Sequence, residues 1–258
     1  MSPILSIRNL TVRFGGLCAV NDFSMEVAEG SIHALIGPNG AGKSTVFNCI
    51  SRFCQPSDGS IEFAGRPVLQ LAPHDLVKVG VGRTFQNLEL MHRMTVLENV
   101  LVGLTCRLPG YLPFGPSPRR RRTEAQAVRD AEEILEQAGL AAFRDSLAGE
   151  LDFGRQKLLD LARALAGEPR LLLLDEPAAG LRGREISFVD ALLLDLARRR
   201  KLTIVLVEHV MQLVMSVADR ITVLNFGQKI AEGAPGEVRS DPRVIEAYLG
   251  TDRDAVPV

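Results

Sequence analysis

Residues 37–45 read GPNGAGKST, a glycine-rich segment that fits the pattern G-x-x-x-x-G-K-[ST] and constrains the fold more than any other part of the sequence. The apolar run at residues 31–36 precedes it and the helical run VFNCISRF follows it, which is the strand–loop–helix setting that the pattern needs. Gly37, Gly40 and Gly42 lack Cβ atoms, so successive backbone N–H groups can wrap a polyphosphate. The segment therefore predicts a phosphate-binding loop.

The chemistry of the loop indicates a nucleoside triphosphate with Mg²⁺. The ammonium of Lys43 suits the β- and γ-phosphates, and the hydroxyl of Ser44 suits the metal. The chain has no N-K-x-D or T-K-x-D for guanine recognition, so ATP is favoured over GTP. The expected ATP-binding set is Gly37, Pro38, Asn39, Gly40, Ala41, Gly42, Lys43, Ser44 and Thr45.

Two adjacent carboxylates follow a second apolar run, LLLLDEP at residues 171–177. Asp175 ends this buried strand and is the candidate that holds Mg²⁺. Glu176 lies one residue further, where a carboxylate could take a proton from an attacking water. The pair predicts phosphoryl transfer to water.

The rest of the chain predicts an α/β fold. Short β-branched runs alternate with helical patterns and glycine-rich turns, which indicates a mostly parallel sheet flanked by helices. The expected core strands cover residues 31–36, 81–85, 171–175, 203–208 and 220–225. Antiparallel edge strands are expected at residues 4–14, 23–27 and 60–63, because short glycine turns separate the first of them.

Composition excludes several other classes of protein. The chain has 258 residues with 30 Lys and Arg against 31 Asp and Glu, so no nucleic-acid partner is expected. No apolar run reaches the roughly 18 to 20 residues that span a bilayer, and the N-terminus lacks a long apolar stretch, so we expect a cytoplasmic protein. The four cysteines form no C-x-x-C pair, which favours reduced thiols over a zinc site.

The middle of the chain predicts a helical subdomain. Residues 96–101 and 124–139 have helical periodicity, and a proline-rich stretch between them reads as a long loop. The basic run at residues 119–122 is interpreted as a solvated helix entry, with contact to acidic lipid headgroups or to a partner loop as the alternative.

The chain resembles the ATP-binding-cassette (ABC) ATPases from about residue 5 to residue 250. Besides the two phosphate motifs, four further features of the sequence stand in the same order as in that family. The resemblance places Phe14 on the adenine ring, Gln86 at the end of a strand as a sensor of Mg²⁺ and the attacking water, and His209 at the γ-phosphate. It implies one ABC-type domain over residues 1–258. Residues 1–86 would form the antiparallel β subdomain and the P-loop part of the core, residues 87–162 the helical subdomain, and residues 163–258 the remainder of the core.

The fourth feature is the segment ELDFGRQKLLDLARALAGEP at residues 150–169, which is similar to the family's signature segment and its helix. The resemblance implies that Asp152, Phe153, Gly154 and Arg155 contact ATP on a second subunit. The usual L-S-G-G-Q is altered here, and Asp152 would bring a carboxylate towards a γ-phosphate, with Arg155 within one helical turn to neutralise it. We therefore hypothesise that this segment forms the poorer of two composite sites in a mixed dimer. Arg182 also stands where the family commonly has Asp or Asn.

Within the family the match is nearest to the ATPases of branched-chain amino-acid importers, on segments such as FGGLCAVNDFS, VGVGRTFQNLELMHRMTVLENV and the ending DPRVIEAYLG. This resemblance implies a peripheral subunit on the inner face of the cell membrane. Its partners would be permease subunits, a second ABC ATPase and, indirectly, an extracellular or periplasmic substrate-binding protein. Uptake of urea or short amides stays open, as does a more distant lipopolysaccharide exporter.

Three rival classes differ in function. A chromosome or repair ATPase would insert a long coiled coil, for which 258 residues leave no room. A translation factor would carry two cassettes, whereas this chain has one phosphate-binding loop. A regulatory partner that binds ATP without hydrolysing it stays conceivable because the signature segment is altered.

Overall fold

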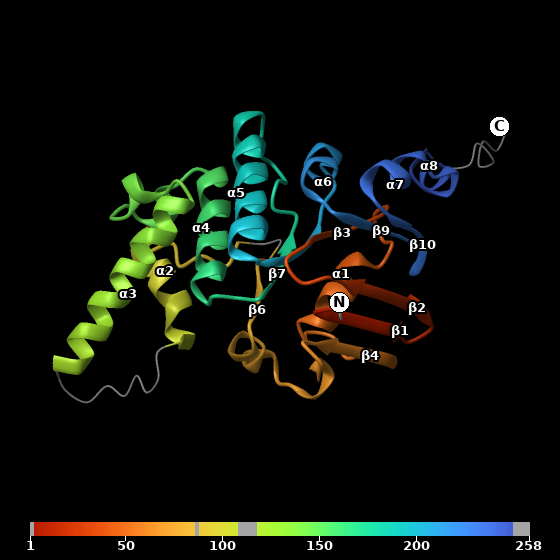
Figure 1. Ribbon diagram of the computed structural model, residues 1–258, viewed down its shortest axis with the longest axis horizontal. Coiled ribbons are helices and arrows are strands. Elements are labelled where there is room, and N and C mark those ends of the chain that lie inside the picture. The colour runs from red at the N-terminus through yellow and green to blue at the C-terminus, as the bar shows by residue number, and fades with distance from the viewer. Residues whose placement is uncertain (1–2, 86–87, 108–117, 250–258) are drawn as a thin grey trace. The chain divides into compact units, whose positions relative to one another are not determined.

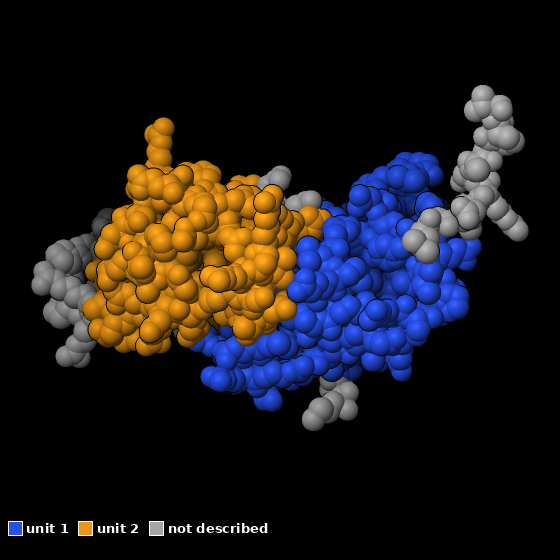
Figure 2. Space-filling view, turned by 90° about the horizontal axis from the view of Figure 1, so that it is seen from above, with its two compact units in different colours: residues 1–73, 193–258 blue, residues 74–192 orange. Residues whose placement is uncertain are grey.

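The structure is a computed structural model that describes residues 3–85, 88–107 and 118–249, with the side chains of residues 118–123 and 249 left out (Figure 1). The chain divides into two compact units, which Figure 2 colours separately. Unit 1 contains residues 1–73 and 193–258, and unit 2 contains residues 74–192. The three-part division expected from the sequence, with boundaries at residues 86 and 162, stays a prediction.

The core of unit 1 is a group of four strands in the order β10-β9-β3-β8. β3 lies between β8 and β9 and is parallel to both, and β10 is antiparallel to β9. All residues of β3 and β8 are buried, as expected for parallel strands covered on both faces. The bounds are β3 (Ile32–Ile36), β8 (Thr203–Val207), β9 (Arg220–Asn225) and β10 (Gln228–Gly233).

A second sheet of unit 1 is antiparallel, in the order β2-β1-β4-β5. β1 alternates between buried and exposed positions over part of its length, and Phe23 and Met25 of β2 are buried on the face that packs on the core. The strands are β1 (Leu5–Phe14), β2 (Leu17–Val27), β4 (Asp58–Phe63) and β5 (Arg66–Pro67).

Short helices complete unit 1. α1 follows β3 through the glycine-rich loop (Figure 1), and its residues Val46 and Phe47 are buried. The helices are α1 (Lys43–Ile50), α6 (Met211–Val217), α7 (Pro235–Ser240) and α8 (Pro242–Leu249), with a 3₁₀ turn at Val68–Gln70.

Unit 2 combines two parallel strands, β6 (Val81–Arg83) and β7 (Leu171–Asp175), with helices that pack on one another. A capping box at Thr95 and Glu98 starts α2, and Asp152 caps α4. The helices are α2 (Val96–Leu104), α3 (Pro118–Gln137), α4 (Phe153–Ala166) and α5 (Arg184–Arg200), the last of which reaches beyond the unit at Leu192. The 3₁₀ turns of unit 2 are Val77–Val79, Thr105–Arg107, Ala141–Phe143 and Ala148–Glu150. A further 3₁₀ turn, Pro73–Asp75, lies at the boundary between the units.

The strands predicted from the sequence are present in the structure, but several of their ends differ. β7 and β9 have the predicted bounds, whereas β2 begins at Leu17 instead of residue 23 and β6 ends at Arg83 instead of residue 85. β2 was underestimated because its register with β1 shifts several times, and Asp22 has a positive φ of 52° inside the strand. β10 was missed, because QKIAEG is an edge strand in which polar Gln228 and Lys229 stand side by side and are exposed, so the alternation typical of a strand is absent.

Within the described residues, no helix is long and apolar enough to cross a membrane.

Candidate nucleotide site

The phosphate-binding loop of unit 1 joins β3 to α1 and is shaped by close backbone contacts. A Cβ atom at Gly37 would lie 2.0 Å from the carbonyl oxygen of Leu224, and a Cβ atom at Gly42 would lie 2.6 Å from that of Ala19. Gly42 is also the N-cap of α1 with a φ of 104°, a conformation that side chains rarely adopt. Only glycine fits these two positions, so the predicted role of the glycines rests on packing as well as on access to phosphate.

Lys43 is buried at the centre of this loop. Its Nζ donates hydrogen bonds of 2.8 Å to the carbonyl oxygens of Gly37 and Pro38. Since buried ammonium groups need compensation, these carbonyls hold the charge inside the loop. Ser44 is exposed on the first turn of α1, beside the N–H groups at the helix N-terminus. The loop thus presents a cation, a hydroxyl and backbone donors together.

Three segments of unit 1 meet at one edge of its parallel strands. Ile36 of β3 is in register with Val223 of β9, and Leu35 is in register with Val207 of β8. The phosphate-binding loop, the turn after β9 and His209 after β8 therefore leave the strands at their common carboxyl edge, where α/β proteins bind ligands. His209 is exposed, and buried Glu208 accepts hydrogen bonds from the backbone N–H groups of His209 and Val210 at 2.6 and 3.1 Å.

The other three histidines have structural or surface positions. His33 is buried, with Nε2 2.8 Å from the hydroxyl of Thr222, and His74 and His92 are exposed. Burial lowers the pKa of His33 to about 4.

Phe14 lies at the tip of the β1–β2 hairpin, opposite Leu17 in the register. Its side chain is 54% exposed and that of Leu17 is 67% exposed, so neither belongs to the core. The C-terminal helix also approaches the loop: burial raises the pKa of Tyr248, and a hydrogen bond from the backbone N–H of Gly37 opposes that shift.

The acidic pair lies in unit 2, at the end of β7. Asp175 is buried, its backbone N–H donates to Thr84 Oγ1 at 3.3 Å, and its Oδ2 lies 3.4 Å from Nη2 of Arg83. Burial raises the pKa of Asp175 in spite of this ion pair, while burial also lowers the pKa of Arg83. The carboxylate of Asp175 is therefore held at the end of β7 by Arg83, and carboxylate oxygens are hard donors of the kind that Mg²⁺ prefers.

Glu176 has a φ of 51°, in the left-handed region that non-glycine residues seldom occupy. Its carbonyl oxygen accepts hydrogen bonds from Lys157 Nζ and, at 3.2 Å, from the backbone N–H of Ala179. These bonds hold a strained turn directly after β7, and such strain is often found at functional residues.

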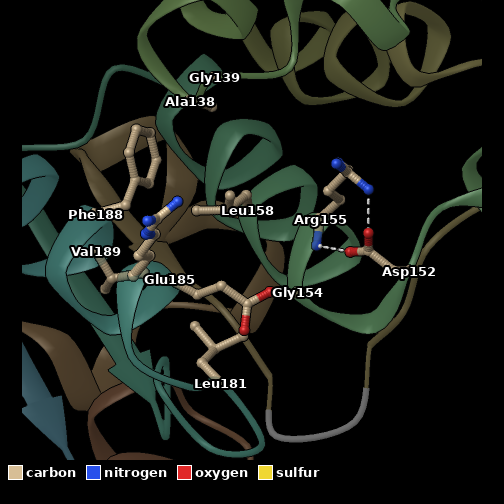
Figure 3. A pocket seen from close by; sticks show the side chains of 11 residues that line it. Ala138, Gly139, Asp152, Gly154, Arg155, Leu158, Leu181, Glu185, Phe188 and Val189 are labelled. Atoms are coloured by element: carbon tan, nitrogen blue, oxygen red, sulfur yellow. Dashed lines mark hydrogen bonds and ion pairs between the residues drawn. The ribbon is translucent and has the colours of Figure 1, made fainter.

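The signature segment lies beside a pocket of about 260 Å³ in unit 2 (Figure 3). Oδ1 of Asp152 accepts a hydrogen bond of 2.9 Å from the backbone N–H of Arg155, and Oδ2 pairs with the Arg155 guanidinium. The same guanidinium lies 4.4 Å from the centre of the Phe143 ring. The charge of Asp152 is thus engaged by Arg155.

The segment packs tightly on the residues that follow Glu176. A Cβ atom at Gly154 would lie 2.5 Å from Oε1 of Glu185, and one at Gly180 would lie 2.8 Å from the ring of Phe153. Oε2 of Glu185 accepts a hydrogen bond of 3.0 Å from the backbone N–H of Arg182. Glu185, like Arg83, was missed by the sequence analysis, because a single charged residue carries no recognisable pattern.

Of the predicted site residues, Gln86 lies outside the described residues. The structure brings the loop residues, Phe14 and His209 into unit 1, and brings Asp175, Glu176 and residues 152–155 into unit 2.

Comparisons with known proteins cover nearly the whole chain. The ABC transporter family matches residues 20–179, and a family described as branched-chain amino acid ATP-binding cassette transporter matches residues 228–254. Over 250 residues the chain is 44% identical to the high-affinity branched-chain amino acid transport ATP-binding protein BraF of Pseudomonas aeruginosa, covering 96% of this chain and 98% of BraF. It is 42% identical to LivG, of the same description, from Escherichia coli K12, with the same coverage of both chains.

Solved structures are similar over the same range. MJ1267, an ATP-binding cassette of an ABC transporter in its ADP conformation, has a TM-score of 0.84 and 34% identity, covering 97% of this chain and all of that one. The dimeric bacterial ABC transporter cassette MJ0796 has a TM-score of 0.78 and 26% identity, covering 90% of this chain and 98% of that one.

Proposed function

The chain belongs to the ABC transporter family of ATP-binding proteins, and on this basis we propose that it is the ATP-hydrolysing subunit of an importer of branched-chain amino acids. The observation that carries the proposal is the loop in which Gly37 and Gly42 admit no side chain and Lys43 is buried. The substrate class rests on the names of BraF and LivG, and on the matched segment at residues 228–254.

In this proposal the loop holds the phosphates of ATP. Backbone N–H groups of residues 37–45 and the Lys43 ammonium contact the β- and γ-phosphates, and the exposed ring of Phe14 stacks on the base. Lys43 would exchange the carbonyls of Gly37 and Pro38 for phosphate oxygens, so its charge stays compensated in both states.

Ser44 and Asp175 are the residues that would hold Mg²⁺, together with Gln86. The buried carboxylate of Asp175 and the exposed hydroxyl of Ser44 are hard oxygen donors of the kind this cation takes. When bound, Mg²⁺ would neutralise charge on the phosphates.

Glu176 accepts a proton from the attacking water, and His209 contacts the γ-phosphate. Two sets of hydrogen bonds support these roles, because they fix the backbone from which the Glu176 and His209 side chains extend. Lys157 donates to the carbonyl oxygen of Glu176, and the backbone N–H of His209 donates to Glu208. The charge that develops on the transferred group is stabilised by the loop donors and Lys43.

Residues 152–155 contact ATP held by a second cassette subunit. That arrangement is supported by the similarity to MJ0796, which is dimeric. The partner is a second copy or a related ATPase, and the pair drives permease subunits from the inner face of the membrane, with a substrate-binding protein on the far side.

Co-purification tests the assembly. The tagged chain is isolated from its native membrane in mild detergent, and the proteins that elute with it are identified by mass. We expect two polytopic membrane proteins and a second cassette ATPase. Elution alone, or with proteins that have no membrane-spanning segment, would remove the transport role.

A further inference from the structure

Phe226 occupies a position that neither packing nor turn chemistry explains. It is the first of two residues that join β9 to β10, between the paired residues Asn225 and Gln228. Its φ is 44° and that of Gly227 is 76°, which are the signs of a type I′ turn. Its ring is 87% exposed, the most exposed of the large apolar side chains in the described residues.

A phenylalanine is unfavourable here for two reasons. The first central position of a type I′ turn favours Asn, Asp or Gly, because other side chains clash with the backbone when φ is positive. An aromatic ring left in water also gains nothing from burial. A residue that breaks two local rules at once is a candidate for function.

The turn is fastened to the phosphate-binding loop. The backbone N–H of Gly227 donates to the carbonyl oxygen of Ala41 at 2.9 Å. Its own carbonyl accepts from the N–H of Asn21 in β2, also at 2.9 Å. A Cβ atom at Gly227 would lie 2.8 Å from the carbonyl of Ala19, the same group that excludes a side chain at Gly42. The turn, the loop and β2 therefore meet at Ala19.

The carboxyl edge of unit 1 has a polar and an apolar side. His209 follows β8 on one side of β3, and the turn with Phe226 follows β9 on the other. The β1–β2 hairpin, with exposed Phe14 and Leu17, belongs to the β9 side, because β2 contacts β10 and the turn. If the phosphates lie over the loop and towards His209, the base lies on the side of these exposed apolar groups.

We propose that Phe226 forms an apolar wall of the nucleobase site, its ring contacting the base of the ATP whose phosphates the loop holds. The proposal rests on the nucleotide role assigned to the loop and to Phe14 above. A base leaves one face open when a single ring stacks on it, and a second ring supplies further apolar contact. Because stacking acts on the π-face that every base has, Phe226 strengthens binding without selecting adenine over guanine.

The test replaces Phe226 by the residue that the turn prefers. Phe226→Asn relieves the backbone and removes the ring, so the melting temperature of the full chain is expected to rise by about 2 °C while ATP binds about tenfold more weakly. Binding is measured by titration calorimetry with ATP, GTP and inorganic tripolyphosphate. The affinity for both nucleotides should fall by the same factor, and that for tripolyphosphate should not change.

Ala64→Asn is the matched control. Ala64 and Gly65 join β4 to β5 in a two-residue turn with φ values of 48° and 74°, and Ala64 is exposed. This variant should stabilise the fold in the same way and leave nucleotide binding unchanged.

Several results would overturn the proposal. Unchanged ATP affinity in Phe226→Asn removes the ring from the site, and an equal loss for tripolyphosphate means that the turn acts on the loop instead of the base. A weaker subunit association at constant ATP affinity assigns Phe226 to the dimer contact. Failure of the unaltered chain to bind ATP would refute the proposed function itself, whereas the other three results leave that function standing.

Discussion

Arg83 and Asp175 form an ion pair in which Nη2 and Oδ2 are 3.4 Å apart, with the two side chains 10% and 5% exposed. Burial raises the pKa of Asp175 and lowers that of Arg83, so desolvation of both groups outweighs their attraction. The arginine lies on β6 and the aspartate on the neighbouring strand β7, which fixes the carboxylate at the strand end.

Removal of the arginine should therefore destabilise unit 2. Arg83→Met keeps most of the side-chain volume and leaves a buried carboxylate without its cation, which is expected to lower the free energy of unfolding by about 3 kcal/mol near neutral pH. Adding Asp175→Asn should recover much of the loss. Urea unfolding of the single and double variants measures the loss and the recovery of the free energy of unfolding. The loss should shrink in acid, where Asp175 becomes protonated, and a constant loss at all pH values would contradict the account.

His33 should make the protein sensitive to acid. The pKa of His33 is about 4 in the folded protein and 6.5 in the unfolded chain. As the pH falls, the unfolded chain therefore takes up a proton at a higher pH than the folded protein does. The stability that this histidine contributes is complete above pH 6.5 and is lost as the pH falls towards 4, by about 3 kcal/mol in total. Urea unfolding over this range should show a smaller loss in His33→Gln than in the unaltered chain. Equal losses would mean that other groups govern acid sensitivity.

Glu176→Gln should separate ATP binding from turnover. The amide keeps the size of the side chain and cannot accept the proton of water, so kcat is expected to fall at least about 100-fold. The Kd for ATP should stay unchanged, as measured by calorimetry, because Glu176 is not among the groups that hold the phosphates. Near-normal turnover in the assembled complex would remove Glu176 from the role of base.

The signature segment offers a charge test. Arg155→Gln leaves the Asp152 carboxylate without its partner guanidinium, and ATP turnover by the assembled complex should fall about tenfold, because the carboxylate would then repel the γ-phosphate of the partner's ATP. Asp152→Ser in the same chain removes the repelling charge, keeps an N-cap oxygen for α4, and should restore turnover. The hypothesis of a poorer composite site requires that Arg155 compensates this charge only in part, so Asp152→Ser alone should raise turnover. Unchanged turnover in that variant would refute the hypothesis.

Much of the fold could be predicted from local patterns. The bounds of β7 and β9 follow from buried apolar runs, and the structure has both strands at the predicted residues. β10 was not predicted, because this edge strand lacks the regular alternation of apolar and polar residues that is typical of a strand.

Candidate site residues could be predicted from the sequence only where a motif exists, and those predictions stay predictions. The loop residues, Asp175 and Glu176 are read directly from two short patterns. Arg83 acquires its meaning from Asp175 on the neighbouring strand, and Phe226 acquires its meaning from the turn that Gly227 joins to Ala41 by a hydrogen bond. No spacing in the sequence brings those groups together, since each contact joins segments far apart in the chain.

The central claim is that ATP bound through Lys43 drives uptake of branched-chain amino acids, and uptake by the reconstituted complex tests it most directly. The purified complex is placed in liposomes with ATP inside, and its substrate-binding protein is supplied outside with labelled leucine or labelled urea. The account predicts that leucine accumulates and urea does not, and that Lys43→Ala abolishes accumulation. Accumulation of urea instead of leucine, or undiminished leucine uptake by Lys43→Ala, would contradict it.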